Sequence, residues 1–187
     1  MSQLFRSIFV LFFFLTFNCN LFANENSNHS MKHEEHMHDQ STMPGLQGKD
    51  TTEQEVNDLK TIFKNHYNIS RKVVNIDNGI VTETISLNAE VREAILNHVS
   101  MMVTRMEEGR DPEVFIQSPT LSELFNYYDK IETEIEVTDY GVKLIQTSID
   151  PVVVNLLQMH ASEITDMVDR GMMAVHERMM TSNKYNN

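Results

Sequence analysis

The sequence contains one cysteine in 187 residues, and that cysteine, Cys19, lies near the N-terminus. A chain with one thiol forms no internal disulfide and offers no C-x-x-C pair for redox chemistry or thiolate metal binding. Other catalytic patterns are also missing: there is no G-x-S-x-G, no H-E-x-x-H and no glycine-rich loop to cradle a phosphate. The sequence therefore gives no basis for assigning an enzyme activity.

Positive charge is also scarce. The chain has 15 Lys and Arg against 27 Asp and Glu, which gives a formal net charge of −12. A surface this acidic repels nucleic acid and anionic lipid, and it suits cationic ligands or basic partners. We therefore expect no nucleic-acid partner.

Long apolar runs are confined to residues 1–23, which have the pattern of a signal peptide. Arg6 provides a positive start, the run IFVLFFFLTF is short for a membrane span, and Leu-Phe-Ala precedes Asn24 as a cleavage site. Cys19 lies inside this segment, and the residues before it fit a lipoprotein acylation site poorly. The sequence predicts a mature protein that is periplasmic or secreted and free of the membrane after cleavage.

Residues 24–50 carry few large apolar side chains and are predicted to be a disordered tail. The tail concentrates imidazole and thioether groups within ten residues, and it resembles the His/Met-rich segments of exported copper-handling proteins. Its candidate metal ligands are His29, His33, His36, His38, Met31 and Met37. A flexible segment of this kind can wrap a metal ion without a preformed site. The alternative is a tail that is only solvated.

The rest of the chain repeats itself. Shifting the sequence by 62 residues superposes 59–109 on 121–171 without a gap and leaves ten identical positions. We therefore predict a single duplicated domain over 51–182, with copies at about 51–110 and 111–180.

Each copy is predicted to contain a short helix, a β-hairpin and a long helix. The short helices begin with Thr-x-x-Glu capping boxes at 52–55 and 120–123. The long helices begin at Asn88 and at Asp150-Pro151, where proline at the first helical position is well tolerated.

The hairpin turns are predicted at Asp-Asn-Gly 77–79 and Asp-Tyr-Gly 139–141, where glycine would supply a positive φ. The run IETEIEVT at 131–138 alternates as a strand with one acidic, solvated face. The fold class is therefore predicted as α+β. About four antiparallel strands would form one sheet or two packed hairpins, covered by the two long helices.

This duplicated helix–hairpin–helix layout resembles a family of small exported bacterial proteins. The resemblance covers about residues 45–180. It implies the same layout and export, and it implies no function, because no activity is established for that family.

The segment MMAVHERMM at 172–180 combines soft metal donors on one side of a predicted helix. Met172, Met173, Met179 and Met180 lie three or four residues from His176, so all five share one face. Thioether and imidazole together favour Cu(I) over hard cations. The alternatives are methionines that fill gaps in a core or form an adaptable partner surface.

Two further histidines, His98 and His160, occupy the same position in the two copies, each on the apolar stripe of its long helix. A pseudo-twofold axis would bring the two imidazoles together as a bis-His site, which could supply the axial ligands of a haem. The alternative is a pair of buried structural histidines.

Three hypotheses follow for the function. The leading one is an exported metal-binding protein that buffers or delivers copper through its His-rich tail and Met/His faces. The second is a haem-binding module that uses His98 and His160. The third is a non-catalytic interaction module whose Met-rich C-terminal helix binds a partner protein.

Overall fold

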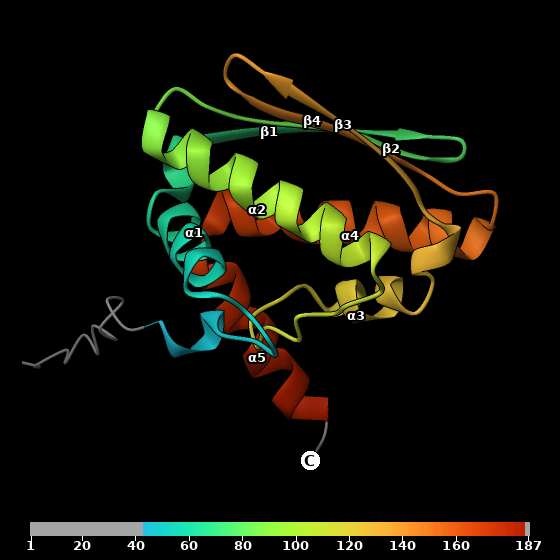
Figure 1. The fold of residues 1–187 in the computed structure, drawn as a ribbon. Coiled ribbons are helices and arrows are strands. Elements are labelled where there is room, and N and C mark those ends of the chain that lie inside the picture. Colours follow the sequence, from blue (N-terminus) through green and yellow to red (C-terminus); the bar gives the residue numbers. More distant parts are fainter. Residues whose placement is uncertain (1–42, 186–187) are drawn as a thin grey trace, which may run out of the picture. The chain divides into compact units, whose positions relative to one another are not determined.

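The predicted α+β fold is present, with two helix–hairpin–helix units joined through one sheet (Figure 1). The computed structural model describes residues 43–185, so the predicted signal peptide and the six tail ligands lie outside the described residues. The elements are η1 (Pro44–Leu46), α1 (Glu53–Lys64), η2 (His66–Asn68), β1 (Ile69–Ile76), β2 (Gly79–Ser86), α2 (Ala89–Glu107), α3 (Pro119–Phe125), η3 (Tyr128–Lys130), β3 (Glu132–Thr138), β4 (Gly141–Thr147), α4 (Pro151–Arg170) and α5 (Met172–Tyr185).

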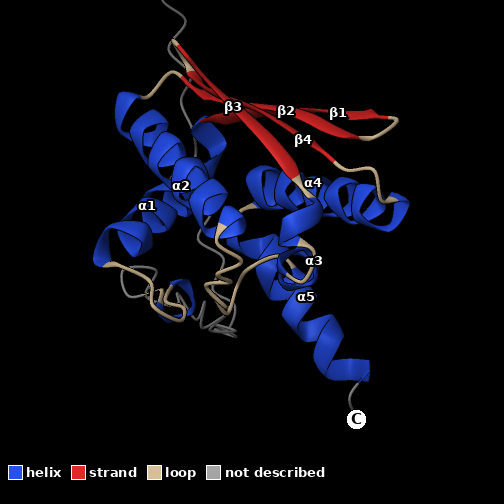
Figure 2. Cartoon of the chain, turned by 45° about the vertical axis from the view of Figure 1, so that its right-hand side comes forward, coloured by secondary structure: helices blue, strands red, loops and turns tan. Residues whose placement is uncertain are grey.

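The two hairpins form a single antiparallel sheet with the order β1-β2-β4-β3, and not two packed sheets. Strands β2 and β4 pair at the centre, where one copy meets the other. The helices lie on one side of the sheet (Figure 2). Helix α4 of the second copy contacts β1 and β2 of the first, whereas α2 contacts β4 in addition to β2 and β3. The long helix of each copy therefore packs on strands of the other copy, so the two copies share one packed structure.

The helix starts follow the predictions in three of four cases. Thr52 and Glu55 form the expected capping box, and the side chains of Asn88 and Asp150 accept backbone N–H bonds at the starts of α2 and α4. The box predicted at 120–123 is wrong. Helix α3 begins at Pro119, so Thr120 lies inside it and donates its hydroxyl to Glu163 at 2.7 Å.

The positive φ predicted for the two turn glycines is present at Gly79, with φ 158°, and absent at Gly141. Both glycines are the first residues of their strands, and a second constraint applies to both. A Cβ at Gly79 would lie 1.9 Å from the carbonyl oxygen of Gln146, and one at Gly141 would lie 2.1 Å from that of Thr84. The close approach of β2 and β4 therefore excludes a side chain at both positions.

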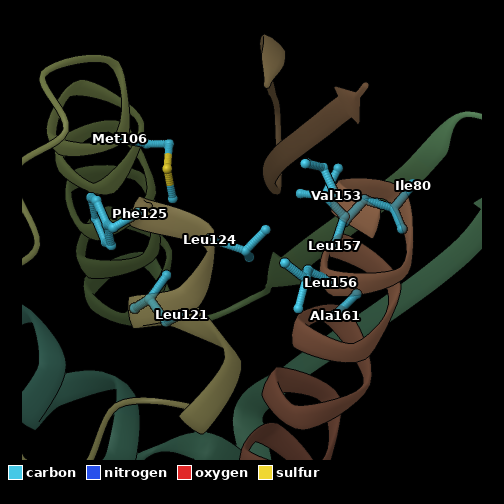
Figure 3. Close-up of a cluster of buried hydrophobic side chains, with 9 residues drawn as sticks. All are labelled: Ile80, Met106, Leu121, Leu124, Phe125, Val153, Leu156, Leu157 and Ala161. Carbon is cyan, nitrogen blue, oxygen red and sulfur yellow. The ribbon is translucent and has the colours of Figure 1, made fainter. Parts of the chain in front are cut away.

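The main core lies among α2, α3 and α4 and reaches the sheet at Ile80 (Figure 3). Its buried members come from both copies, and they are Ile80, Met106, Leu121, Leu124, Phe125, Val153, Leu156, Leu157 and Ala161. Since α4 supplies four of them, the second long helix is the central packing element of the domain.

A second core cluster changes the predicted domain boundary. Met43 and Leu46, which composition placed in the 24–50 tail, are 8% and 1% exposed and pack in this cluster with residues of α5. The backbone N–H of Lys49 donates to the carbonyl oxygen of Pro112. The packed domain therefore includes residues 43–50, because two buried apolar side chains, this backbone bond and the ion pair of Asp50 with Arg105 hold the segment in place.

Candidate functional sites

Helix α5 carries the first candidate site. Gly171, with φ 57°, ends α4 and redirects the chain, so that Ala174 and Val175 pack into the second core cluster. Met173 and Met180, on the other side of the helix, are 70% and 63% exposed. This helix therefore buries one face and presents thioethers on another.

The predicted five-residue stripe is divided by this packing. His176 is exposed with Met173 and Met180, at the i, i+3, i+7 spacing of one helix face. Met172 is partly buried against the core cluster, and the side chain of Met179 is not among the described ones. The structure thus leaves one imidazole and two thioethers accessible together.

A cavity of about 190 Å³ is the second candidate site. It lies between α2, α4 and the helix-facing side of the sheet, with the 112–118 connection also on its wall. His98 and His160 both line it, so the structure brings the two equivalent histidines into one space. Three methionines of α2 line it as well: Met101, Met102 and Met106.

Both imidazoles in the cavity are neutral at pH 7. Burial is the main cause that lowers the pKa of each to about 4. At His160 the positive charge of Arg71 acts in the same direction and Glu163 opposes it, whereas at His98 the opposing charge is Glu55. Nδ1 of His160 lies 2.7 Å from the hydroxyl oxygen of Ser118, which fixes the ring orientation. Among the described residues, no hydrogen bond is made to the imidazole of His98.

Arg71 was not predicted as a site residue, and it is the unusual member of the cavity wall. It faces the helices from β1, on the same side as Ile69 and Val73. Its Nη1 donates to Thr84 Oγ1 at 2.6 Å, whereas its buried Nε has no hydrogen-bond partner among the described residues. Burial lowers the pKa of Arg71 to about 10, so the guanidinium is still charged at neutral pH.

Arg105 shows how the same fold pairs another buried guanidinium. Its side chain is 1% exposed, and its Nε and Nη2 donate to the two carboxylate oxygens of Glu55 at 2.6 and 3.1 Å. Nη1 donates to Asp50 at 2.7 Å. Glu55 also borders the cavity, but its charge is already balanced by Arg105.

The cavity fits neither a haem nor a bare metal ion well. An apolar cavity of about 150 Å³ holds one benzene molecule, and a porphyrin is several times larger. The positive charge of Arg71 also opposes any cation placed near His160. The bis-His pair is therefore close in space without forming a pocket for the predicted haem.

A sequence signal for Arg71 existed. The run ISRKVVNI alternates, and it places Arg71 on the apolar face between Ile69 and Val73. A charged residue on the inward face of a strand marks either a buried ion pair or a ligand site. The pairing partner, however, is a property of the tertiary structure and cannot be read from the strand itself.

No protein-family model, no curated protein and no solved structure matches this chain. Within residues 43–185, no helix is both long enough and apolar enough to cross a membrane. The same part of the chain contains no group of three or more His, Cys, Asp or Glu side chains that could hold a metal ion.

Proposed function

We propose that the protein is an exported copper-binding protein that holds Cu(I) on the outer face of α5 and in its His/Met-rich tail. The observation that carries the proposal is the joint exposure of Met173, His176 and Met180 on one helix face. Export, to the periplasm or outside the cell, rests on the signal-peptide pattern of residues 1–23.

The chemistry of the face supports Cu(I) in particular. Thioether sulfur is a soft donor that discriminates against Mg²⁺ and Ca²⁺, and imidazole is a good copper ligand. Along a helix that rises 1.5 Å per residue, His176 lies about 4.5 Å from Met173 and about 6 Å from Met180, within reach of flexible methionine side chains. The net charge of −12 also favours a cation.

The test is a competition titration on the untagged mature chain, under reducing conditions, against a chromophoric Cu(I) chelator. The variant Met173→Leu/Met180→Leu removes both sulfurs and conserves side-chain volume, so packing changes by less than about 1.5 kcal/mol. We expect the loss of one bound Cu(I) per chain, or affinity at that site weakened tenfold or more. Met159→Leu is the matched control, because Met159 is a 47% exposed methionine on α4.

The same variants separate copper binding from the interaction hypothesis. If Met173 and Met180 form a partner surface, the double variant keeps its Cu(I) stoichiometry and loses a partner in a pull-down from the native compartment. Equal Cu(I) binding by the double variant and by Met159→Leu would contradict a copper site on α5.

A further inference from the structure

The guanidinium of Arg71 lacks a counter-ion within the described chain. Its only hydrogen bond there is to a hydroxyl, and burial is the sole cause of its lowered pKa. Buried charges in folded proteins are normally paired, because an isolated charge loses its hydration without compensation. Arg105 follows this rule with two carboxylates, so Arg71 is a clear departure from it.

The edge of Arg71 that lacks a partner is the edge that binds carboxylates. Arg105 uses Nε and Nη2 to hold both oxygens of Glu55. Nε and Nη2 of Arg71 make no hydrogen bond with the described residues. Such a fork binds a carboxylate by donating two parallel N–H···O hydrogen bonds. Nε is out of contact with solvent, so the guanidinium must rotate before Nε can donate to a ligand in the cavity.

The surroundings of Arg71 complete an anion-binding pocket. Within the described chain, the cavity wall carries two charged side chains, Arg71 and Glu55. The charge of Glu55 is neutralised by Arg105. The neutral imidazoles of His98 and His160 offer N–H groups without adding positive charge. Arg71 therefore makes one polar end of the cavity positive. The carboxylate of Glu163, which also acts on His160, is not on the cavity wall and accepts hydrogen bonds from Thr120.

Most of the remaining wall is apolar, and its polar members are Thr51, Thr82, Gln117, Ser118 and Gln146. Val99, Val103, Leu121, Leu124 and Ile164 line it together with the methionines of α2. An apolar wall opposite a charged anchor is the usual construction of a site for an amphipathic small molecule. By scaling from the benzene-sized cavity of about 150 Å³, 190 Å³ accommodates a ligand of about eight non-hydrogen atoms.

We propose that this cavity binds a small apolar carboxylate, such as a six-carbon fatty acid or an aromatic acid. The carboxylate pairs with Arg71 beside the two imidazoles, and its hydrocarbon part lies against the methionines of α2. This site is separate from the copper face on α5 and does not depend on it.

Calorimetric titration of the full mature chain at pH 7 tests the proposal with three probes of matched length: hexanoate, 1-hexanol and hexylammonium. We expect hexanoate to bind at least tenfold more tightly than hexanol, and hexylammonium to bind most weakly. Arg71→Met keeps the apolar stem and removes the charge, so hexanoate affinity should fall tenfold or more while hexanol affinity is unchanged. Arg92→Met is the control, because Arg92 does not line the cavity.

Several results would overturn the proposal. These are equal binding of hexanol and hexanoate, a preference for hexylammonium, no binding of any probe at millimolar concentration, or a preference for hexanoate that survives in Arg71→Met. If Arg71→Met does not fold, Arg71→Gln replaces it. The comparison of the three probes on the unchanged chain tests the proposal independently of either variant. Met173→Leu/Met180→Leu should leave hexanoate binding intact, so failure of the copper proposal and failure of this one are distinguishable.

Discussion

Arg105, which is buried, and Arg71, which is partly buried, should respond in opposite ways to the same substitution. Arg105→Met removes the partner of Glu55, whose side chain is 11% exposed and would keep only the bonds from Thr52. Breaking a buried ion pair by removing one member costs about 3 to 5 kcal/mol, because a charge is left buried and unpaired. For a domain of this size, a loss of about 3 kcal/mol lowers the melting temperature by roughly 10 °C.

Arg71→Met removes a charge that has no carboxylate partner in the described chain. The loss is one hydrogen bond to Thr84, worth about 1 kcal/mol, and the gain is relief from burying an unpaired guanidinium. Methionine also fills the space of the arginine stem. The expected free energy of unfolding is therefore unchanged, or higher by about 1 to 2 kcal/mol.

Both variants can be compared with the parent chain in urea denaturation followed by circular dichroism, at pH 7 and without ligand. Changes in the midpoint at constant slope report stability alone. If Arg71→Met costs as much as Arg105→Met, the positive charge of Arg71 is compensated in the ligand-free fold, and the argument for an external carboxylate fails.

Acidification should destabilise the fold in two ranges, measured by the urea midpoint. Burial lowers the pKa of each cavity histidine to about 4, so on acidification the unfolded chain binds protons before the folded chain does. The free energy of unfolding should therefore fall between pH 6.5 and 4, and His160→Asn should make that fall less steep. The pKa of Glu55 is lowered to about 2, so its contribution is present above pH 4.5 and is lost as pH falls toward 2; Glu55→Gln should remove that lower transition. Deleting 24–42 should leave the melting temperature unchanged, whereas deleting 24–50 should lower it by roughly 10 °C, because the longer deletion removes a leucine that is 1% exposed. Gly141→Ala should cost about 2 kcal/mol in chemical denaturation, because its Cβ meets a carbonyl oxygen.

The repeat was the strongest sequence signal, and it extends to the element boundaries. When 62 is added to the bounds of η2, they coincide with the bounds of η3. The bounds of β2 (Gly79–Ser86), shifted in the same way, agree with those of β4 (Gly141–Thr147) to within one residue. Local rules succeeded wherever the partner atoms were a few residues apart, as at the Thr52–Glu55 capping box. They failed at Thr120, whose hydroxyl bonds Glu163 on another helix, a contact between residues far apart in sequence.

The sequence predicted the histidines of the cavity but not its charge, because the pairing of a charge depends on residues that are far apart in sequence. The equivalence of His98 and His160 was visible in the sequence, and the structure brings both to one space. Whether a buried charge is paired depends on the whole fold. Arg105 on α2 donates to Glu55 of α1 and to Asp50, whereas Arg71 on β1 donates to a hydroxyl on the neighbouring strand, and neither set of partners can be read from the local sequence.

Duplication explains the cavity, and the divergence of the two copies explains its charge. Equivalent residues 62 positions apart line its walls: Leu59 and Leu121, His98 and His160, Met102 and Ile164. The position equivalent to Arg71 is Thr133, which accepts a bond from Gln146 Nε2 at 3.4 Å, just as the guanidinium of Arg71 donates to Thr84. A fully symmetric cavity would carry two arginines, whose charges would repel each other, or none. With one arginine and one threonine, the cavity that the two imidazoles line has a single positive group among its described wall residues. The cavity therefore has one anchoring end, which selects a ligand with one negative charge and one apolar part.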